Sequence, residues 1–148
     1  MMSMMKRFFL LLASVIALAS CKGPSDVPFT ELDRYYFKNG RDIPGNPKID
    51  SAEAFSELFG VAAVMGEDGQ PTPVDWGREF VIAVVNPVTE YATELTPESL
   101  SLENGELVFT YNETVGERQS WTMQPILLVK VDRKYGTETV RLSKISEE

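Results

Sequence analysis

The chain has 148 residues, of which 43% are hydrophobic and 24% are charged, as in an ordinary globular domain. There are 22 acidic against 14 basic side chains, and the resulting net charge of −8 argues against non-specific binding to nucleic acid. With no histidine and a single cysteine, the sequence excludes an imidazole-based catalytic relay, a histidine-rich metal site and an internal disulfide. We therefore expect neither a cofactor nor a metal.

The N-terminal residues have the organisation of a bacterial lipoprotein signal. A pair of basic residues precedes an apolar run from Phe8 to Leu18. This run is too short to cross a bilayer as a helix, which takes about 20 residues. The following sequence, Leu-Ala-Ser-Cys, ends at Cys21 and resembles a lipobox. We predict that residues 1–20 are a signal peptide and that Cys21 is lipidated; the alternative is an ordinary secretory peptide with a chance cysteine.

Residues 21–29 are predicted to be the lipidated cysteine followed by a flexible tether, because glycine, serine and proline recur there. Lys22 stands where an aspartate would resemble an inner-membrane retention signal. We therefore expect a lipid-anchored protein of the outer membrane, on its periplasmic face or at the cell surface. Without residues 1–20 the charge is −10, so anionic lipids repel the domain and the lipid must hold it there.

Residues 30–148 are predicted to form a single globular domain that begins with a short aromatic strand over 33–37 and a loop over 38–48. A helix is expected next. Asp50 and Glu53 have the spacing of a helix-capping pair, and the apolar residues that follow lie on one helical face. Gly60 is the expected end of this helix.

The rest of the chain is predicted to be strands. The continuous apolar run Phe80–Val85 is typical of a central strand that is buried on both faces. Asn104-Gly105 between two alternating segments predicts a tight hairpin, and residues 112–117 are expected to turn the chain. The other strands are predicted at 89–95, 100–102, 107–111, 121–131 and 137–142. The expected fold is α+β, with one main helix packed on a five- or six-stranded, mostly antiparallel sheet.

Three segments of this domain carry a resemblance to a known group. They are Phe59–Gly66, the stretch Val74-Asp75-Trp76 with the strand that follows it, and Pro125–Tyr135. Together they resemble small uncharacterised outer-membrane lipoproteins of Bacteroidetes over most of residues 50–142, a group that implies a location but no activity. The order of helix and sheet more distantly resembles the C-terminal domain of the protease-complex subunit PrcB, which binds a partner protease. The Gly-Gly-Tyr type of turn of that domain is replaced here by residues 85–88.

Enzymatic chemistry finds little support in the sequence. A serine nucleophile needs a base, and with no histidine and no Ser-x-x-Lys spacing none is apparent. Two carboxylate pairs, Asp75 with Glu79 and Glu90 with Glu94, have a spacing that places both members on one face of a strand. Among 22 acidic residues such pairs arise by chance, so we interpret them as solvated surface charge.

The candidate contact residues are aromatic and basic. Trp76 lies in an expected loop, where it need not be part of the hydrophobic core. Trp121 and Tyr91 have polar-tipped rings that can stack on a sugar or anchor a peptide. Arg133 belongs to the one local basic cluster of the acidic domain. The competing interpretation is that the rings fill the core and that the basic cluster lies at a hairpin rim.

These observations predict a non-enzymatic, membrane-anchored lipoprotein. Its expected role is protein binding, as an accessory subunit or inhibitor-like domain of an envelope complex. The alternative is a glycan-binding accessory module that uses exposed aromatic side chains. A carboxylate-based hydrolase is a third class, which a convergent carboxylate pair in a cleft would support.

Overall fold

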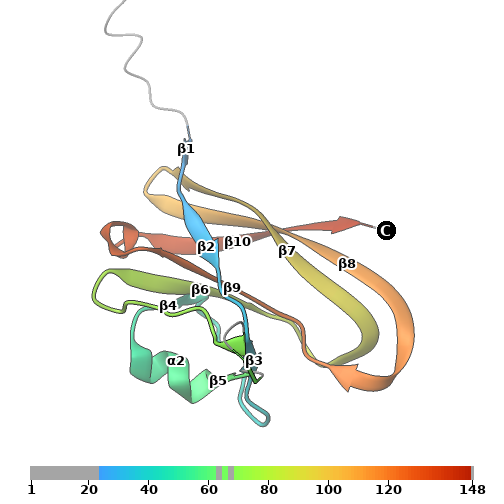
Figure 1. Ribbon diagram of the computed structural model, residues 1–148. Coiled ribbons are helices and arrows are strands. Elements are labelled where there is room, and N and C mark those ends of the chain that lie inside the picture. Colours follow the sequence, from blue (N-terminus) through green and yellow to red (C-terminus); the bar gives the residue numbers. More distant parts are fainter. Residues whose placement is uncertain (1–23, 63–64, 67–68, 148) are drawn as a thin grey trace, which may run out of the picture.

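The computed structural model of the protein describes residues 24–62, 65–66 and 69–147 (Figure 1). It contains one short helix, α2 (Ala52–Leu58), and a single turn of 3-10 helix, η2 (Arg133–Tyr135). Ten strands make up most of the described residues: β1 (Ser25–Asp26), β2 (Phe29–Glu31), β3 (Tyr35–Phe37), β4 (Lys48–Ile49), β5 (Phe59–Val61), β6 (Glu79–Val85), β7 (Thr89–Glu103), β8 (Glu106–Met123), β9 (Ile126–Asp132) and β10 (Thr139–Glu147).

The predicted α+β fold, one main helix on a five- or six-stranded sheet, is wrong. The structure is mostly β: 57% of the described residues lie in strands and 9% are helical, and the ten described strands form three sheets. The expected turn at 112–117 is absent, because β8 runs without interruption through these residues and pairs with β7 on both sides of them. A long hairpin of 15- and 18-residue strands results, and it forms the middle of a sheet that is separate from the one that contains β6.

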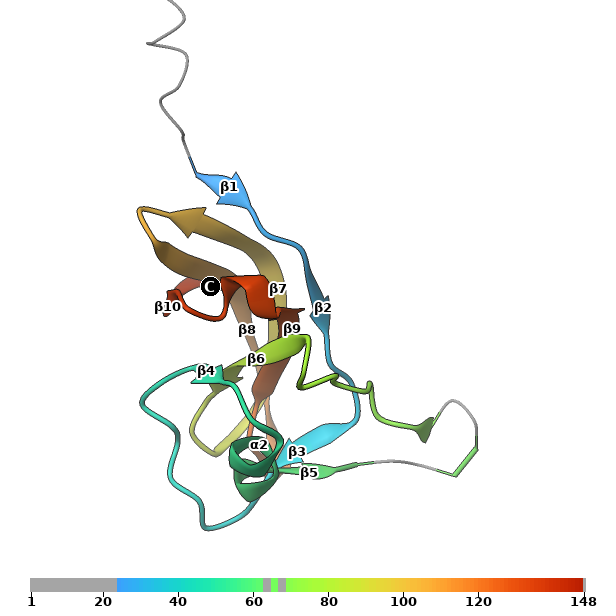
Figure 2. The same cartoon turned by 90° about the vertical axis from the view of Figure 1, so that its left-hand side faces the viewer.

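The two larger sheets each have four strands. The first, which we call the hairpin sheet, has the order β1-β7-β8-β10, and the second, the central sheet, has the order β2-β9-β6-β4. Between described strands the pairing is antiparallel except for β8 with β10, which run parallel. The hairpin sheet covers one face of the central sheet, while α2 and the two-stranded sheet β3-β5 cover the other (Figure 2).

Two hydrophobic cores lie on the two faces of the central sheet. Phe80, Ile82 and Val84 of β6 point into the core against the hairpin sheet, whereas Val81 and Ala83 point into the core under α2. The predicted strand buried on both faces is therefore confirmed. Full burial of one such aliphatic or aromatic side chain contributes about 1.5–3 kcal/mol, so β6 is the element on which both layers depend.

The predicted Asn104-Gly105 hairpin is also confirmed. β7 ends at Glu103 and β8 begins at Glu106. Both turn residues have positive φ, 51° for Asn104 and 76° for Gly105, which suits a type I′ turn and the twist of the strands that it joins.

The helix is shorter than expected and is capped by a different residue. The Ser51 side chain, rather than Asp50, accepts a hydrogen bond from the Ala54 N–H at 3.1 Å. The helix ends after Leu58, before the expected Gly60, because Phe59 is extended and pairs with Phe37 of β3.

The predicted tether is described from residue 24 onward, and its segment from Ser25 to Phe29 is part of the fold. β1 pairs with β7 of the hairpin sheet, β2 pairs with β9 of the central sheet, and Val27 between them is buried. The Val27 N–H donates to the Leu100 carbonyl at 2.8 Å. This segment therefore joins the edges of the two sheets. Residues 1–23, which include Cys21 and the predicted signal peptide, lie outside the described residues. In the part of the chain that the structure describes, no helix is long and apolar enough to span a membrane.

Candidate functional site

At the end opposite its Asn104-Gly105 turn, the hairpin sheet curves strongly, and its two strands turn back toward the ends of β6 and β9, to which they connect (Figure 1). We call residues 88–94 and 115–123 the hairpin bend. Between the pairs Thr93–Val115 and Thr89–Met123, β7 advances by four residues while β8 advances by eight. Extra residues on one strand of a pair bend that strand and increase its twist. The unequal lengths of the two strands thus account for the bend.

The inner surface of the hairpin bend lacks large buried hydrophobic side chains. Leu95 is the buried residue of β7 nearest the bend, and Tyr111 is the corresponding buried residue of β8. In the described part of the chain, the next positions toward the bend on the same strand faces are Thr93 and Glu113, which are only half-buried. The bend therefore holds together as a pair of strands without a continuous hydrophobic core beneath it.

Large hydrophobic side chains are exposed on this bend. Nine such residues are exposed in the described part of the chain, and four of them lie here: Val88 (61% exposed), Tyr91 (48%), Val115 (54%) and Trp121 (63%). Single exposed apolar residues are ordinary, but four of them within one bend make it a candidate contact surface.

Of the predicted contact residues, Tyr91 and Trp121 are the two that lie on the hairpin bend. Their strands pair through Tyr91 with Arg118, three residues before Trp121. Val88 and Val115 were not predicted as contact residues, because one valine in a loop and one in a segment expected to turn give no signal of exposure. That these residues contact a partner stays a prediction.

Trp76 and Arg133, two of the predicted contact residues, make structural contacts within the domain. Trp76 is half-buried in the core under α2, and its ring centroid lies 5.4 Å from that of Phe55. The expectation that Trp76 lies outside the hydrophobic core is therefore wrong. The Arg133 guanidinium donates through Nη2 to the carbonyls of Asp50 at 2.8 Å and Glu79 at 3.0 Å. It ties the start of α2 to the central sheet, and neither residue lies on the bend.

Polar contacts fix both ends of the bend. The Glu113 carboxylate accepts a hydrogen bond from the Asn86 amide and lies 3.0 Å from the Lys144 ammonium of β10. The hydrogen bond to Glu113 and its charge raise the pKa of Lys144. Within the bend, Glu90 and Arg118 form an ion pair at 2.7 Å between β7 and β8.

Two shallow hollows lie on the bend. One, of about 290 Å³, is lined by Val88, Val115 and Glu113 with neighbouring threonines. The other, of about 340 Å³, is lined by Ala92, Met123 and further residues of both strands. Both hollows combine apolar side chains with hydroxyl and carboxylate groups. That combination suits side chains of a protein partner better than a deeply enclosed small molecule.

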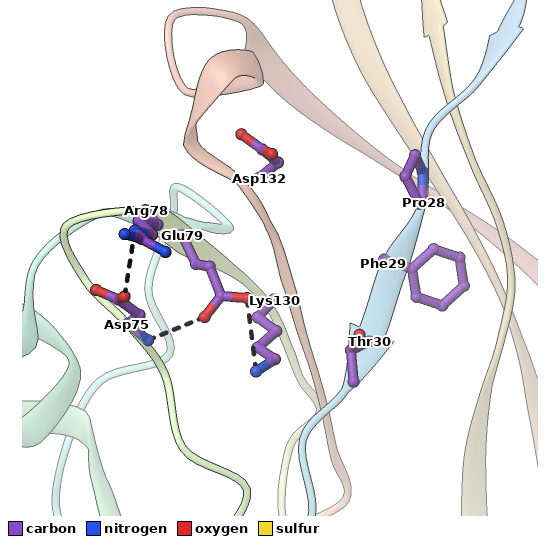
Figure 3. Close-up of a pocket in the computed structure, with 8 residues that line it drawn as sticks. All are labelled: Pro28, Phe29, Thr30, Asp75, Arg78, Glu79, Lys130 and Asp132. Atoms are coloured by element: carbon purple, nitrogen blue, oxygen red, sulfur yellow. Dashed lines mark hydrogen bonds and ion pairs between the residues drawn. The ribbon is translucent and has the colours of Figure 1, made fainter.

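A larger pocket of about 450 Å³ lies between β2 and the loop before β6, and it contains the first predicted carboxylate pair (Figure 3). Glu79 accepts a hydrogen bond from the Asp75 N–H at 2.9 Å and lies 3.5 Å from the Lys130 ammonium. Asp75 accepts from the Gly77 N–H at 3.1 Å and faces Arg78 at 3.8 Å.

These contacts give both carboxylates of the pocket a role in holding the loop around residues 75–79. In the second predicted pair, Glu90 is bound to Arg118. No group of three or more residues able to ligate a metal occurs in the described ranges. The charged pocket is therefore best explained as a structural ion-pair network.

Comparison with known proteins adds no relative: no family model matches the chain, and no curated protein or solved structure is significantly similar to it. The resemblance to Bacteroidetes lipoproteins and to the PrcB domain accordingly stays a prediction.

Proposed function

We propose that this chain is a non-enzymatic envelope lipoprotein that binds another protein through the hairpin bend, as an accessory subunit or inhibitor-like domain. Cys21 is its lipidated residue, and it is held at the outer membrane on the periplasmic face or at the cell surface. The observation that carries the proposal is the group of four exposed hydrophobic side chains on a strand pair without a core beneath it.

The composition of this surface supports a protein partner. Tryptophan and tyrosine dominate the energetics of protein interfaces, since they bury a large area at a small cost in side-chain entropy. Trp121 and Tyr91 lie among exposed threonine, serine and glutamate residues of the same strands. An apolar centre surrounded by polar groups is the usual organisation of an interface.

The place of the bend relative to the anchor also favours this function. Cys21 precedes Ser25 by four residues, which span at most about 14 Å. Ser25 pairs with Leu102 near the hairpin turn, and the path along β7 from Leu102 to Thr89 is roughly 43 Å. A lipid at Cys21 would therefore hold the turn end of the hairpin near the bilayer and leave the bend free to reach a partner.

Position-specific photo-cross-linking tests the proposal in cells that produce the full chain. A photoreactive amino acid at exposed Ser120 should give one discrete cross-linked protein, whereas the same group at exposed Glu57 of α2 should not. Replacing Tyr91 and Trp121 by alanine should abolish the Ser120 product, while replacing the equally exposed Tyr36 should not. Equal cross-linked products from the photoreactive group at Ser120 and at Glu57, or no product from Ser120, would contradict the proposal.

A glycan-binding module is the second candidate, because two aromatic rings, Tyr91 and Trp121, are exposed on the same bend. Titration of the protein with polysaccharide from the same envelope distinguishes the two candidates. Saturable quenching of tryptophan fluorescence that is lost in Trp121→Ala and kept in Tyr36→Ala would favour a glycan. Unchanged fluorescence would remove this candidate.

A further inference from the structure

The two edges of β8 are not equally occupied along its length. From Glu106 to Thr114, β8 pairs with β7 on one edge and with β10 on the other, and the last pair with β10 is Thr114–Glu147. From Val115 to Met123, the described strands offer a partner on the β7 side alone. The outer edge of this nine-residue stretch therefore presents backbone N–H and C=O groups to solvent.

The neighbouring strand, β7, has fewer free backbone groups for pairing with an added strand in the same region. The Tyr91 N–H already donates to the Thr89 hydroxyl at 3.1 Å, and the Tyr91 carbonyl accepts from the Thr93 hydroxyl at 3.0 Å. Further along β7, Pro97 lacks an N–H altogether. Within the described residues, no side chain makes a hydrogen bond to the backbone of β8 from Val115 to Met123. This stretch also contains no proline.

The open edge has the length and the side chains that an added strand needs. Measured along its curved path, this stretch of nine strand residues is roughly 30 Å long, which exceeds the usual length of a strand in a globular protein. Val115 and Trp121, near its two ends, are 54% and 63% exposed. A strand laid along this edge would satisfy backbone groups and cover both side chains, as in other cases of strand addition.

Charge restricts the chemistry of the incoming strand. Arg118 is already paired with Glu90, whereas Glu94 and Glu117 are exposed and take part in no ion pair among the described residues. The whole chain carries a net charge of −8. A second copy would bring the same negative charges together, whereas a segment rich in lysine or arginine would be attracted to this edge.

We infer that the outer edge of β8 from Val115 to Met123 takes up an extended, basic segment of the partner protein as an added β-strand, which continues the line of β10. This inference rests on the proposed function, because it specifies how the bend would bind its partner. It commits to the chemistry of the segment, namely cationic side chains that alternate with apolar ones.

The test uses the full chain in detergent micelles and a blocked nine-residue peptide of alternating lysine and valine. When the peptide is in excess, amide hydrogen exchange should slow by about tenfold or more at those amides of residues 115–123 that point to the outer edge, because these amides gain partners. A peptide of alternating glutamate and valine should not do this. Neither should the lysine peptide when it is N-methylated at every residue, because that form has no backbone N–H donor on either edge.

A charge reversal far from the core supplies the matched variant. Glu117 is exposed, so Glu117→Lys should leave the exchange of the buried strands unchanged while it weakens peptide binding several-fold. The reversal of an exposed carboxylate away from the bend, Glu57→Lys, should have no effect on binding.

Three results would overturn the inference: no protection by the lysine peptide, equal protection by the glutamate or methylated peptides, or protection without peptide together with a dimer mass. None of them would remove a Ser120 cross-link that depends on Trp121. Failure of strand addition and failure of the proposed function are therefore distinguishable.

Discussion

Phe109 and Trp121 lie on the same strand, β8, but in opposite environments, and replacing each by alanine tests the whole arrangement. Phe109 is fully buried in the core between the two larger sheets. Its ring meets Phe29 edge-on at 5.8 Å and stacks on Tyr111 at 6.2 Å. Trp121 is 63% exposed on the hairpin bend.

The expected losses of stability differ accordingly. Phe109→Ala removes a fully buried ring and leaves a cavity, which costs about 3–5 kcal/mol of unfolding free energy. Trp121→Ala removes a side chain that is already mostly in water, and we expect a loss below about 1 kcal/mol. With an m-value of about 2 kcal/mol/M in urea, the midpoints should fall by roughly 2 M and by less than about 0.5 M.

The assay is urea unfolding followed by far-ultraviolet circular dichroism, so that loss of a tryptophan does not alter the signal. Residues 22–148 include every described helix and strand, which makes this fragment suitable for the comparison. If Trp121→Ala lost as much stability as Phe109→Ala, Trp121 would belong to the core and the bend would not be a free surface. If Phe109→Ala lost less than about 1 kcal/mol, the packing of the hairpin sheet on the central sheet would be refuted.

Three further predictions concern single side chains. Burial, then the charges of Asp33 and Glu94, raise the pKa of Glu31, so ionisation opposes folding. The penalty is absent below the unfolded-state pKa and grows as pH rises through the raised folded-state pKa. Glu31→Gln should therefore raise the free energy of unfolding at neutral pH, by no more than about 0.5 kcal/mol for this exposed group, and leave it unchanged in acid. Trp76→Ala should cost about 2–3 kcal/mol in the same assay because its ring packs on Phe55, and a neutral result would return Trp76 to the candidate contact residues. Cys21→Ser should abolish labelling by radioactive palmitate, and a mutant that is still labelled would refute the lipoprotein prediction.

Features encoded by neighbouring residues were predictable from the sequence. The apolar run at β6 and the Asn104-Gly105 turn were found because burial on two faces and positive φ leave a local signature. The candidate surface was found in part for the same reason: Tyr91 and Trp121 carry the residue chemistry of an interface, although nothing local shows that they are exposed together.

Features that depend on distant pairing were missed. Residues 112–117, with an asparagine and a glycine, have the composition of a turn, yet long-range pairing with β7 keeps them extended in β8. The same holds for Ser25–Phe29, whose glycine- and proline-rich surroundings suggest a tether and which instead joins the edges of two sheets. The parallel pairing of β10 with β8 has no local signature, because it joins strands that are separated by β9.

The hairpin bend follows from the lack of large apolar residues where the core ends. Up to Leu95 and Tyr111, inward positions are filled and the hairpin is held on the central sheet. Beyond them the strands continue on β-forming residues such as threonine, valine and tyrosine, without the buried area that normally stabilises a sheet. An isolated pair of strands is marginal in water. A partner that covers Trp121 would supply the missing buried area. The structure therefore leads us to expect that the bend is the part of the domain that binding stabilises most.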